Sequence, residues 1–82
     1  MAMKLRLEEL SNQIEMMEIL LNGEKRKVHW DLSLSELLKH FSLPSERIAI
    51  ELNREVVRRM DWAKIKVCEG DNLEIIHFVG GG

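Results

Sequence analysis

The feature that most limits how this chain folds is that a single stretch, DLSLSELLKHF at residues 31–41, carries a well-marked helical pattern. Ser33 followed three residues later by Glu36 indicates a capping box, in which each side chain satisfies a free backbone N–H at the start of a helix. The apolar residues recur at the spacing that gives a helix one apolar face: Leu34, Leu37, Leu38 and Phe41. One such helix covers only one face of a sheet, which favours an α+β fold.

The residues before this helix predict a β-hairpin. From Met17 onward the sequence alternates as a strand with one buried face does, and the expected inward residues are Met17, Ile19 and Leu21. Asn22-Gly23 then supplies two residues that adopt positive φ at low cost, as a two-residue hairpin turn requires. The return strand is expected at 25–30, with Lys25, Lys27 and His29 facing water and Arg26, Val28 and Trp30 on the other side.

The second half of the chain predicts further strands and one helical turn. Pro44 ends the helix. A strand is expected at 48–52, followed by a turn at 53–55 and a short return strand at 56–57. Asp61 is expected to cap a helical turn that contains Trp62, Ala63 and Ile65. A turn at 69–71 then leads into a last strand at 73–79. Trp62 is expected to pack this helical turn onto the core.

This order of elements predicts a β-grasp, or ubiquitin-like, fold: a mixed sheet of four to five strands with one main helix on one face. Residues 17–79 are expected to form that domain. Residues 1–16 are expected to form an N-terminal extension that is loosely ordered or a short helix, because Leu7, Leu10 and Ile14 have rough helical spacing in a segment too short to be stable alone.

The last strand also predicts an exposed apolar surface. Its alternation places Leu73 and Ile75 inward and Ile76 and Phe78 on the uncovered face, with Val79 next to them in sequence. Large apolar residues that gather on an open face indicate a partner-docking patch. Such residues also occur singly on small proteins without any function, and the pattern alone leaves both interpretations open.

Gly80, Gly81 and Gly82 follow this strand directly. A backbone without side chains passes through a slot too narrow for other residues, and we expect these glycines to form a flexible tail. What such a tail presents is the α-carboxylate of Gly82, which becomes an acylating group once a partner enzyme transfers it to the α-phosphate of ATP. The alternative interpretation of three glycines is a frayed end or a cloning remnant.

Composition excludes several classes of protein. Twelve basic and fourteen acidic residues give a net charge of −2, without the basic excess of a nucleic-acid-binding protein. No apolar run approaches the ~18 residues of a membrane span, and the N-terminus lacks the pattern of a signal peptide, so a cytoplasmic protein is expected. Its lone cysteine, Cys68, is interpreted as a half-buried thiol beside a turn.

No catalytic or metal-binding constellation is evident in the sequence. The three histidines, His29, His40 and His77, have no metal-ligand spacing with Cys68, and no nucleophile is paired with a base. Arg54, Arg58 and Arg59 are interpreted as a solvated face. We therefore expect neither a metal nor a cofactor, and a protein that is not itself an enzyme.

From Met17 to Gly82 the chain resembles the ThiS family, the sulfur carriers of thiamine biosynthesis. The matching segments, in order, are MEILLNGE, LSELL, IAIELNREVV, DWAKIKVCEGD and LEIIHFVGGG. The family usually begins at about Met17, so residues 1–16 depart from its pattern. Trp62 falls where the family has a tryptophan.

The resemblance implies a carrier that acts as co-substrate and has no catalytic side chains of its own. It implies that a ThiF-like enzyme adenylates Gly82 with ATP and that a sulfur donor protein then supplies the sulfur of a thiocarboxylate. Gly80, Gly81 and Gly82 would enter that enzyme first and the thiazole synthase ThiG afterwards. Two alternatives stay open: a sulfur carrier for molybdopterin synthesis, and a β-grasp interaction module with an inert tail.

Overall fold

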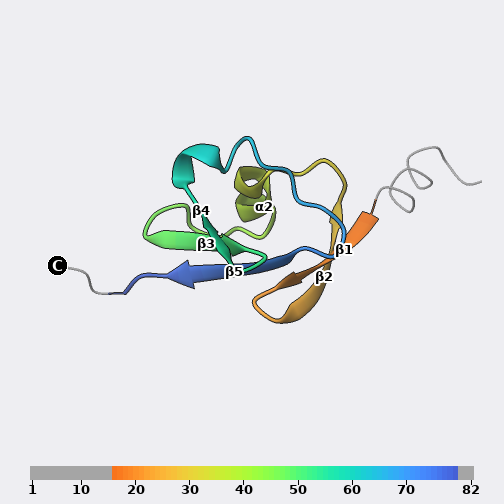
Figure 1. Cartoon of the computed structure of the whole chain (residues 1–82), viewed down its shortest axis with the longest axis horizontal. Coiled ribbons are helices and arrows are strands. Elements are labelled where there is room, and N and C mark those ends of the chain that lie inside the picture. Colours follow the sequence, from red (N-terminus) through yellow and green to blue (C-terminus); the bar gives the residue numbers. More distant parts are fainter. Residues whose placement is uncertain (1–15, 80–82) are drawn as a thin grey trace, which may run out of the picture.

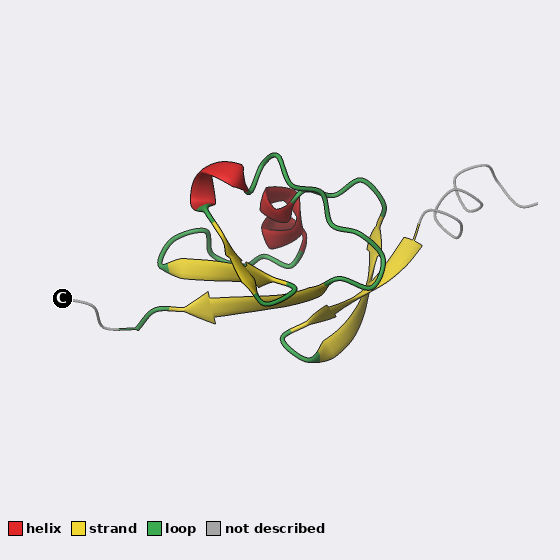
Figure 2. Cartoon of the chain, in the orientation of Figure 1, coloured by secondary structure: helices red, strands yellow, loops and turns green. Residues whose placement is uncertain are grey.

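The computed structural model describes residues 16–79 (Figure 1). In chain order the elements are β1 (Met16–Leu21), β2 (Glu24–His29), the helix α2 (Leu34–His40), β3 (Ile48–Leu52), β4 (Glu55–Val57), the 3-10 helix η1 (Arg59–Asp61) and β5 (Asn72–His77). The strands make one five-stranded sheet in the order β2-β1-β5-β3-β4. Helix α2 lies across one face of this sheet (Figure 2), which confirms the predicted β-grasp architecture.

The last strand in the sequence is the middle strand of the sheet. β5 pairs with β1 in parallel and with β3 antiparallel, whereas the β1–β2 and β3–β4 pairs are antiparallel. The ladder with β3 joins five residue pairs, from Leu52↔Leu73 to Ile48↔His77. The ladder with β1 joins only Leu20↔Asn72 and Leu21↔Leu73. β5 therefore has a partner along its whole length on one side and along only its first residues on the other.

The predicted hairpin is present. Asn22 and Gly23 have φ of 50° and 82°, which is the left-handed conformation that this two-residue turn needs. Strand β1 begins one residue earlier than expected, and β2 ends one residue earlier, at His29. Trp30 lies beyond the strand and is 48% exposed, so its predicted place on the inner face with Val28 is wrong.

The capping box of α2 forms as predicted. Ser33 Oγ accepts the Glu36 backbone N–H at 3.1 Å, and Glu36 Oε1 accepts the Ser33 N–H at 3.0 Å. The bond from the Ser33 backbone favours the ionised carboxyl and lowers the pKa of Glu36. Phe41, expected as the last residue of the apolar face, is the C-cap and is only half-buried.

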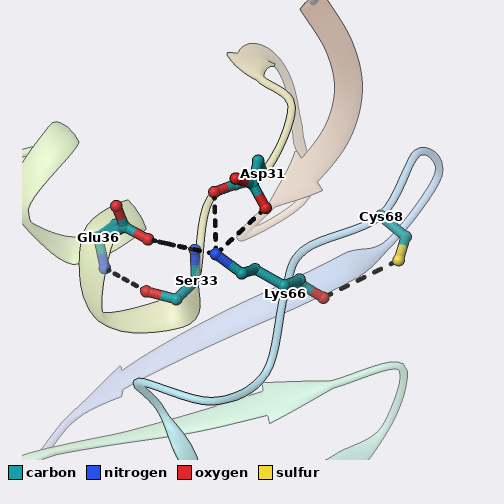
Figure 3. Close-up of polar contacts among 5 residues, drawn as sticks. All are labelled: Asp31, Ser33, Glu36, Lys66 and Cys68. Atoms are coloured by element: carbon teal, nitrogen blue, oxygen red, sulfur yellow. Dashed lines mark hydrogen bonds and ion pairs between the residues drawn. The ribbon is translucent and has the colours of Figure 1, made fainter.

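The loop after Trp62 is attached to the start of this helix. Lys66 Nζ lies 3.2 Å from Asp31 Oδ1 and 3.9 Å from Glu36 Oε1, and it donates to the Asp31 carbonyl (Figure 3). These ion pairs are half-exposed and contribute little alone. The backbone adds a bridge between Ser33 and Lys66 and a bond from the Val67 N–H to the Leu32 carbonyl.

The core lies between α2 and the sheet. Its buried apolar residues are Met17, Ile19, Leu21, Val28, Leu34, Leu37, Leu38, Ile48, Ile50, Trp62, Val67 and Leu73. Trp62 is buried as predicted, and its indole Nε1–H donates to the Val57 carbonyl at 3.0 Å. The buried indole is thus hydrogen-bonded as well as packed.

Three local predictions need correction. The 3-10 helix η1 ends at Asp61, and Asp61 contributes its backbone carbonyl to the next turn, accepting the N–H groups of Lys64 and Ile65. Among residues 16–79, no hydrogen bond to the Asp61 side chain forms the predicted cap. Cys68 is exposed and not half-buried. Finally, β5 ends at His77, two residues before the predicted end of the last strand.

Candidate docking face and tail root

Strand β5 positions the residues that the sequence singled out. Leu73 is fully buried and Ile75 is half-buried on the helix side, whereas Ile76 points to the other face. Beyond the strand, the Phe78 N–H donates to the Arg47 carbonyl at 2.7 Å. This bond continues the pairing along the β3 side of β5 and fixes Phe78 at the point where the chain leaves the sheet.

Two asparagine side chains hold β5 in register. Asn22 donates its backbone N–H to the Leu73 carbonyl at 2.8 Å, and its Oδ1 accepts the Ile75 N–H at 2.7 Å. On the other side of the strand, Asn53 donates its backbone N–H to the Asn72 carbonyl and accepts the Asn72 N–H at its Oδ1, at 2.8 and 2.9 Å. Sequence reasoning treated both asparagines as turn residues alone.

The exposed patch consists of Ile76, Phe78 and Val79, which are 40%, 55% and 88% exposed. The predicted outward orientation of Ile76 and Phe78 agrees with this exposure, and a docking role for the three residues stays a prediction. Ile76 faces Ala49 of β3 on the same side of the sheet. Val56 of β4 also lies on this side and is exposed, an apolar residue that sequence reasoning did not assign to the patch.

Basic and acidic side chains occupy different parts of the rest of the open face. Lys25 and Lys27 project from β2, and Glu18 of β1 pairs with Lys27 in register. Glu51 of β3 stands directly opposite Glu74 of β5, and like charges in this arrangement repel. The open face therefore has a basic edge, an acidic centre and an apolar end at the patch.

The arginines that were predicted to form a solvated face, Arg54, Arg58 and Arg59, do not all have the same surroundings. Arg59 stacks its guanidinium 4.6 Å from the centre of the Trp62 ring and donates to the Ser45 carbonyl. It therefore holds the loop before β3 against the buried tryptophan and is not simply a solvated residue. Arg54 has a positive φ of 72° in the turn between β3 and β4.

The predicted tail, Gly80 to Gly82, lies outside the described residues, as does the predicted extension before Met16. Within residues 16–79 no group of three His, Cys, Asp or Glu side chains is arranged to hold a metal ion. No helix in the same part of the chain is both long and apolar enough to cross a membrane. The candidate site is thus the exposed apolar surface at residues 76–79, which come directly before the glycines in the sequence.

Comparison with known proteins is consistent with this arrangement. Residues 7–82 match the model of the ThiS family. The sulfur carrier protein ThiS of Bacillus subtilis is 33% identical over 63 residues, which are 76% of this chain and 96% of that protein. The crystal structure of a thiamine biosynthesis protein (ThiS) from Geobacter metallireducens superposes with a TM-score of 0.71 at 34% identity, covering 80% of this chain and all of that one.

Longer proteins match as well. A thiazole synthase of Paramagnetospirillum magneticum is 36% identical over 66 residues, and a thiazole synthase of Magnetococcus marinus gives the same identity over the same length. Each match covers 80% of this chain but only 20% of the relative. The chain therefore spans about a fifth of the length of these relatives.

Proposed function

This chain belongs to the ThiS family, and we propose that it carries sulfur for thiamine biosynthesis as a thiocarboxylate on Gly82. The observation that supports this function is the position of the exposed patch. Ile76, Phe78 and Val79 lie immediately before the glycines, on and just after the middle strand of the sheet. A partner that docks on these residues receives the carboxylate of Gly82 at a short and fixed distance along the chain.

The proposed chemistry takes place at the last carboxylate. In the first step, a carboxylate oxygen of Gly82 attacks the α-phosphate of ATP in a ThiF-like enzyme, and pyrophosphate leaves. In the second step, the outer sulfur of a persulfide on a donor protein attacks the acyl carbon and AMP leaves, which gives an acyl disulfide. A thiol then attacks the donor's own sulfur in that bond, forms a new disulfide with the donor and releases the thiocarboxylate. The carrier then delivers this sulfur to a thiazole synthase. The proposed setting is the cytoplasm.

The thiazole synthase relatives favour thiazole over molybdopterin as the destination of the sulfur. A segment similar to this chain occurs within those proteins, and a sulfur carrier has to meet the enzyme that accepts its sulfur. The carrier presents its reacting group to the partner enzyme, and the partner enzyme supplies the catalytic groups.

The wild-type chain provides the direct test. Incubation with a ThiF-like enzyme, ATP and a sulfur donor is expected to raise the intact mass by the difference between sulfur and oxygen, with the change located on Gly82 by fragmentation. Omission of ATP is the control. A mass that stays unchanged with all components present contradicts the proposed function.

The docking role of the patch has a separate test. Replacing Ile76 and Phe78 together by alanine is expected to weaken binding to a thiazole synthase by about 30-fold or more, because buried apolar anchors carry most of the energy of an interface. Binding is measured by titration calorimetry. Val56→Ala is the matched control, since Val56 is exposed on the same face but lies on β4, two strands away from β5. Equal affinities for wild type and double variant rule out docking at the patch.

A further inference from the structure

Strand β5 has an unpaired backbone edge in its second half. β1 ends at Leu21, and its parallel ladder with β5 ends at Leu73. Asn22 extends this contact: its backbone N–H donates to the Leu73 carbonyl, and its Oδ1 accepts the Ile75 N–H. Past Ile75, β5 continues beside β3 on one side, and no strand of residues 16–79 lies on its other side (Figure 2).

The direction of the backbone groups follows from the alternation of a strand. The Asn72 carbonyl and the Phe78 N–H both bond to the β3 side, so the N–H and C=O groups of residues 72, 74, 76 and 78 point to that side. Those of Ile75 and His77 point the other way. The bond from Ile75 to Asn22 confirms this orientation. Within residues 16–79, the Ile75 carbonyl and both backbone groups of His77 have no hydrogen-bond partner.

This edge differs from the two outer edges of the sheet. β2 carries Lys25 and Lys27, and β4 has only three residues; charged side chains and short length are the features that keep edge strands from pairing with other chains. The segment 75–79 reads IIHFV and contains no Asp, Glu, Lys or Arg. It is thus an unprotected edge.

We propose that the edge 75–79 pairs with an extended segment of the enzyme that receives the tail, which adds a strand to the sheet. The proposal rests on the proposed function and names how that docking occurs. The Ile75 carbonyl and both backbone groups of His77 are spaced to bond such a segment through alternate residues. Because Ile76 and Phe78 are exposed on the open side of the sheet, we expect the added strand to carry apolar side chains on that side.

Amide hydrogen exchange tests this pairing in the intact protein. With a cognate thiazole synthase as probe, the His77 N–H is expected to exchange at least about tenfold more slowly in the complex than in the free carrier. The Phe78 N–H, already bonded to Arg47, serves as the internal reference. If the His77 N–H exchanges equally fast in free and bound carrier, the proposal is wrong. If exchange of the His77 N–H in the free carrier slows as the carrier concentration rises, the edge pairs with a second copy of this chain. That result also overturns the proposal.

A substitution gives an independent readout. His77→Pro removes an N–H that no described group uses, and proline is tolerated in a sheet where its nitrogen faces solvent. We expect His77→Pro to bind the synthase about fivefold to tenfold more weakly than His77→Ala, which loses the same imidazole but keeps the N–H. Circular dichroism checks that both variants fold. Equal affinities of the two folded variants contradict the proposal.

The outcomes separate this inference from the proposed function. A carrier that acquires the thiocarboxylate and binds the synthase, but whose His77 amide stays unprotected, docks by its side chains alone. In that case the strand addition fails and the carrier function stands. A chain that acquires no thiocarboxylate fails as a carrier, whatever happens at His77.

Discussion

Deleting Gly82 is expected to reduce thiocarboxylate formation by at least about 100-fold. The shortened chain still ends in a glycine carboxylate, but that carboxylate lies one residue, about 3.5 Å, closer to the domain. A misplacement of about 1 Å at a reacting centre already costs about 100-fold in rate. The rate is measured by intact mass over time with the adenylating enzyme, ATP and sulfur donor at fixed concentrations.

The matched control for this deletion is Gly82→Ala. It keeps the carboxylate at the same reach and adds only a Cβ, so any loss in this variant reports the narrowness of the enzyme's slot. Both variants are expected to unfold at the same temperature as the wild type, because residues 80–82 follow the last described strand. Wild-type rates from the shortened chain show that the reaction does not occur at Gly82.

Replacing Leu73 by alanine is expected to lower the free energy of unfolding by about 2–5 kcal/mol. Leu73 is completely buried at the centre of the sheet and pairs with both Leu21 and Leu52. The neighbouring strands hold the cavity open on both sides, so it collapses poorly. Since small domains have about 5–15 kcal/mol in total, urea denaturation should show a large shift of the midpoint.

Ile76→Ala is the paired control for stability, because Ile76 lies on the same strand but on the open face. Its loss of stability is expected to be about 1 kcal/mol or less. The two variants thus separate folding from docking: Leu73→Ala is expected to alter the unfolding midpoint, and Ile76→Ala the affinity for the synthase. Equal destabilisation by both would mean that β5 is not buried on its helix side.

The elements with strong local signals were predictable from the sequence. The capping box at Ser33 and Glu36 and the Asn22-Gly23 turn depend on residues that are adjacent or one helical turn apart, and both formed as expected. The outward orientation of Ile76 followed from the period of two along a strand. The order of the elements then limited the topology to a few arrangements.

Contacts between distant segments were not predictable in this way. The bond from Ile75 to Asn22 joins residues 53 positions apart, and the bond from Asn72 to Asn53 joins residues 19 apart. Nothing in the local sequence distinguishes an asparagine that only turns the chain from one that also holds a neighbouring strand. The same reason explains why the exposure of Cys68 was misjudged, since burial there depends on what packs above the loop.

The central position of β5 has a consequence for synthesis of the protein. Strands β1 and β3 are joined to each other only through β5, so the hydrophobic interior cannot close until residues 72–77 have been made. A chain that stops before them is expected to stay unfolded and to expose its apolar residues. We therefore expect a folded domain only once synthesis has reached residues 72–77.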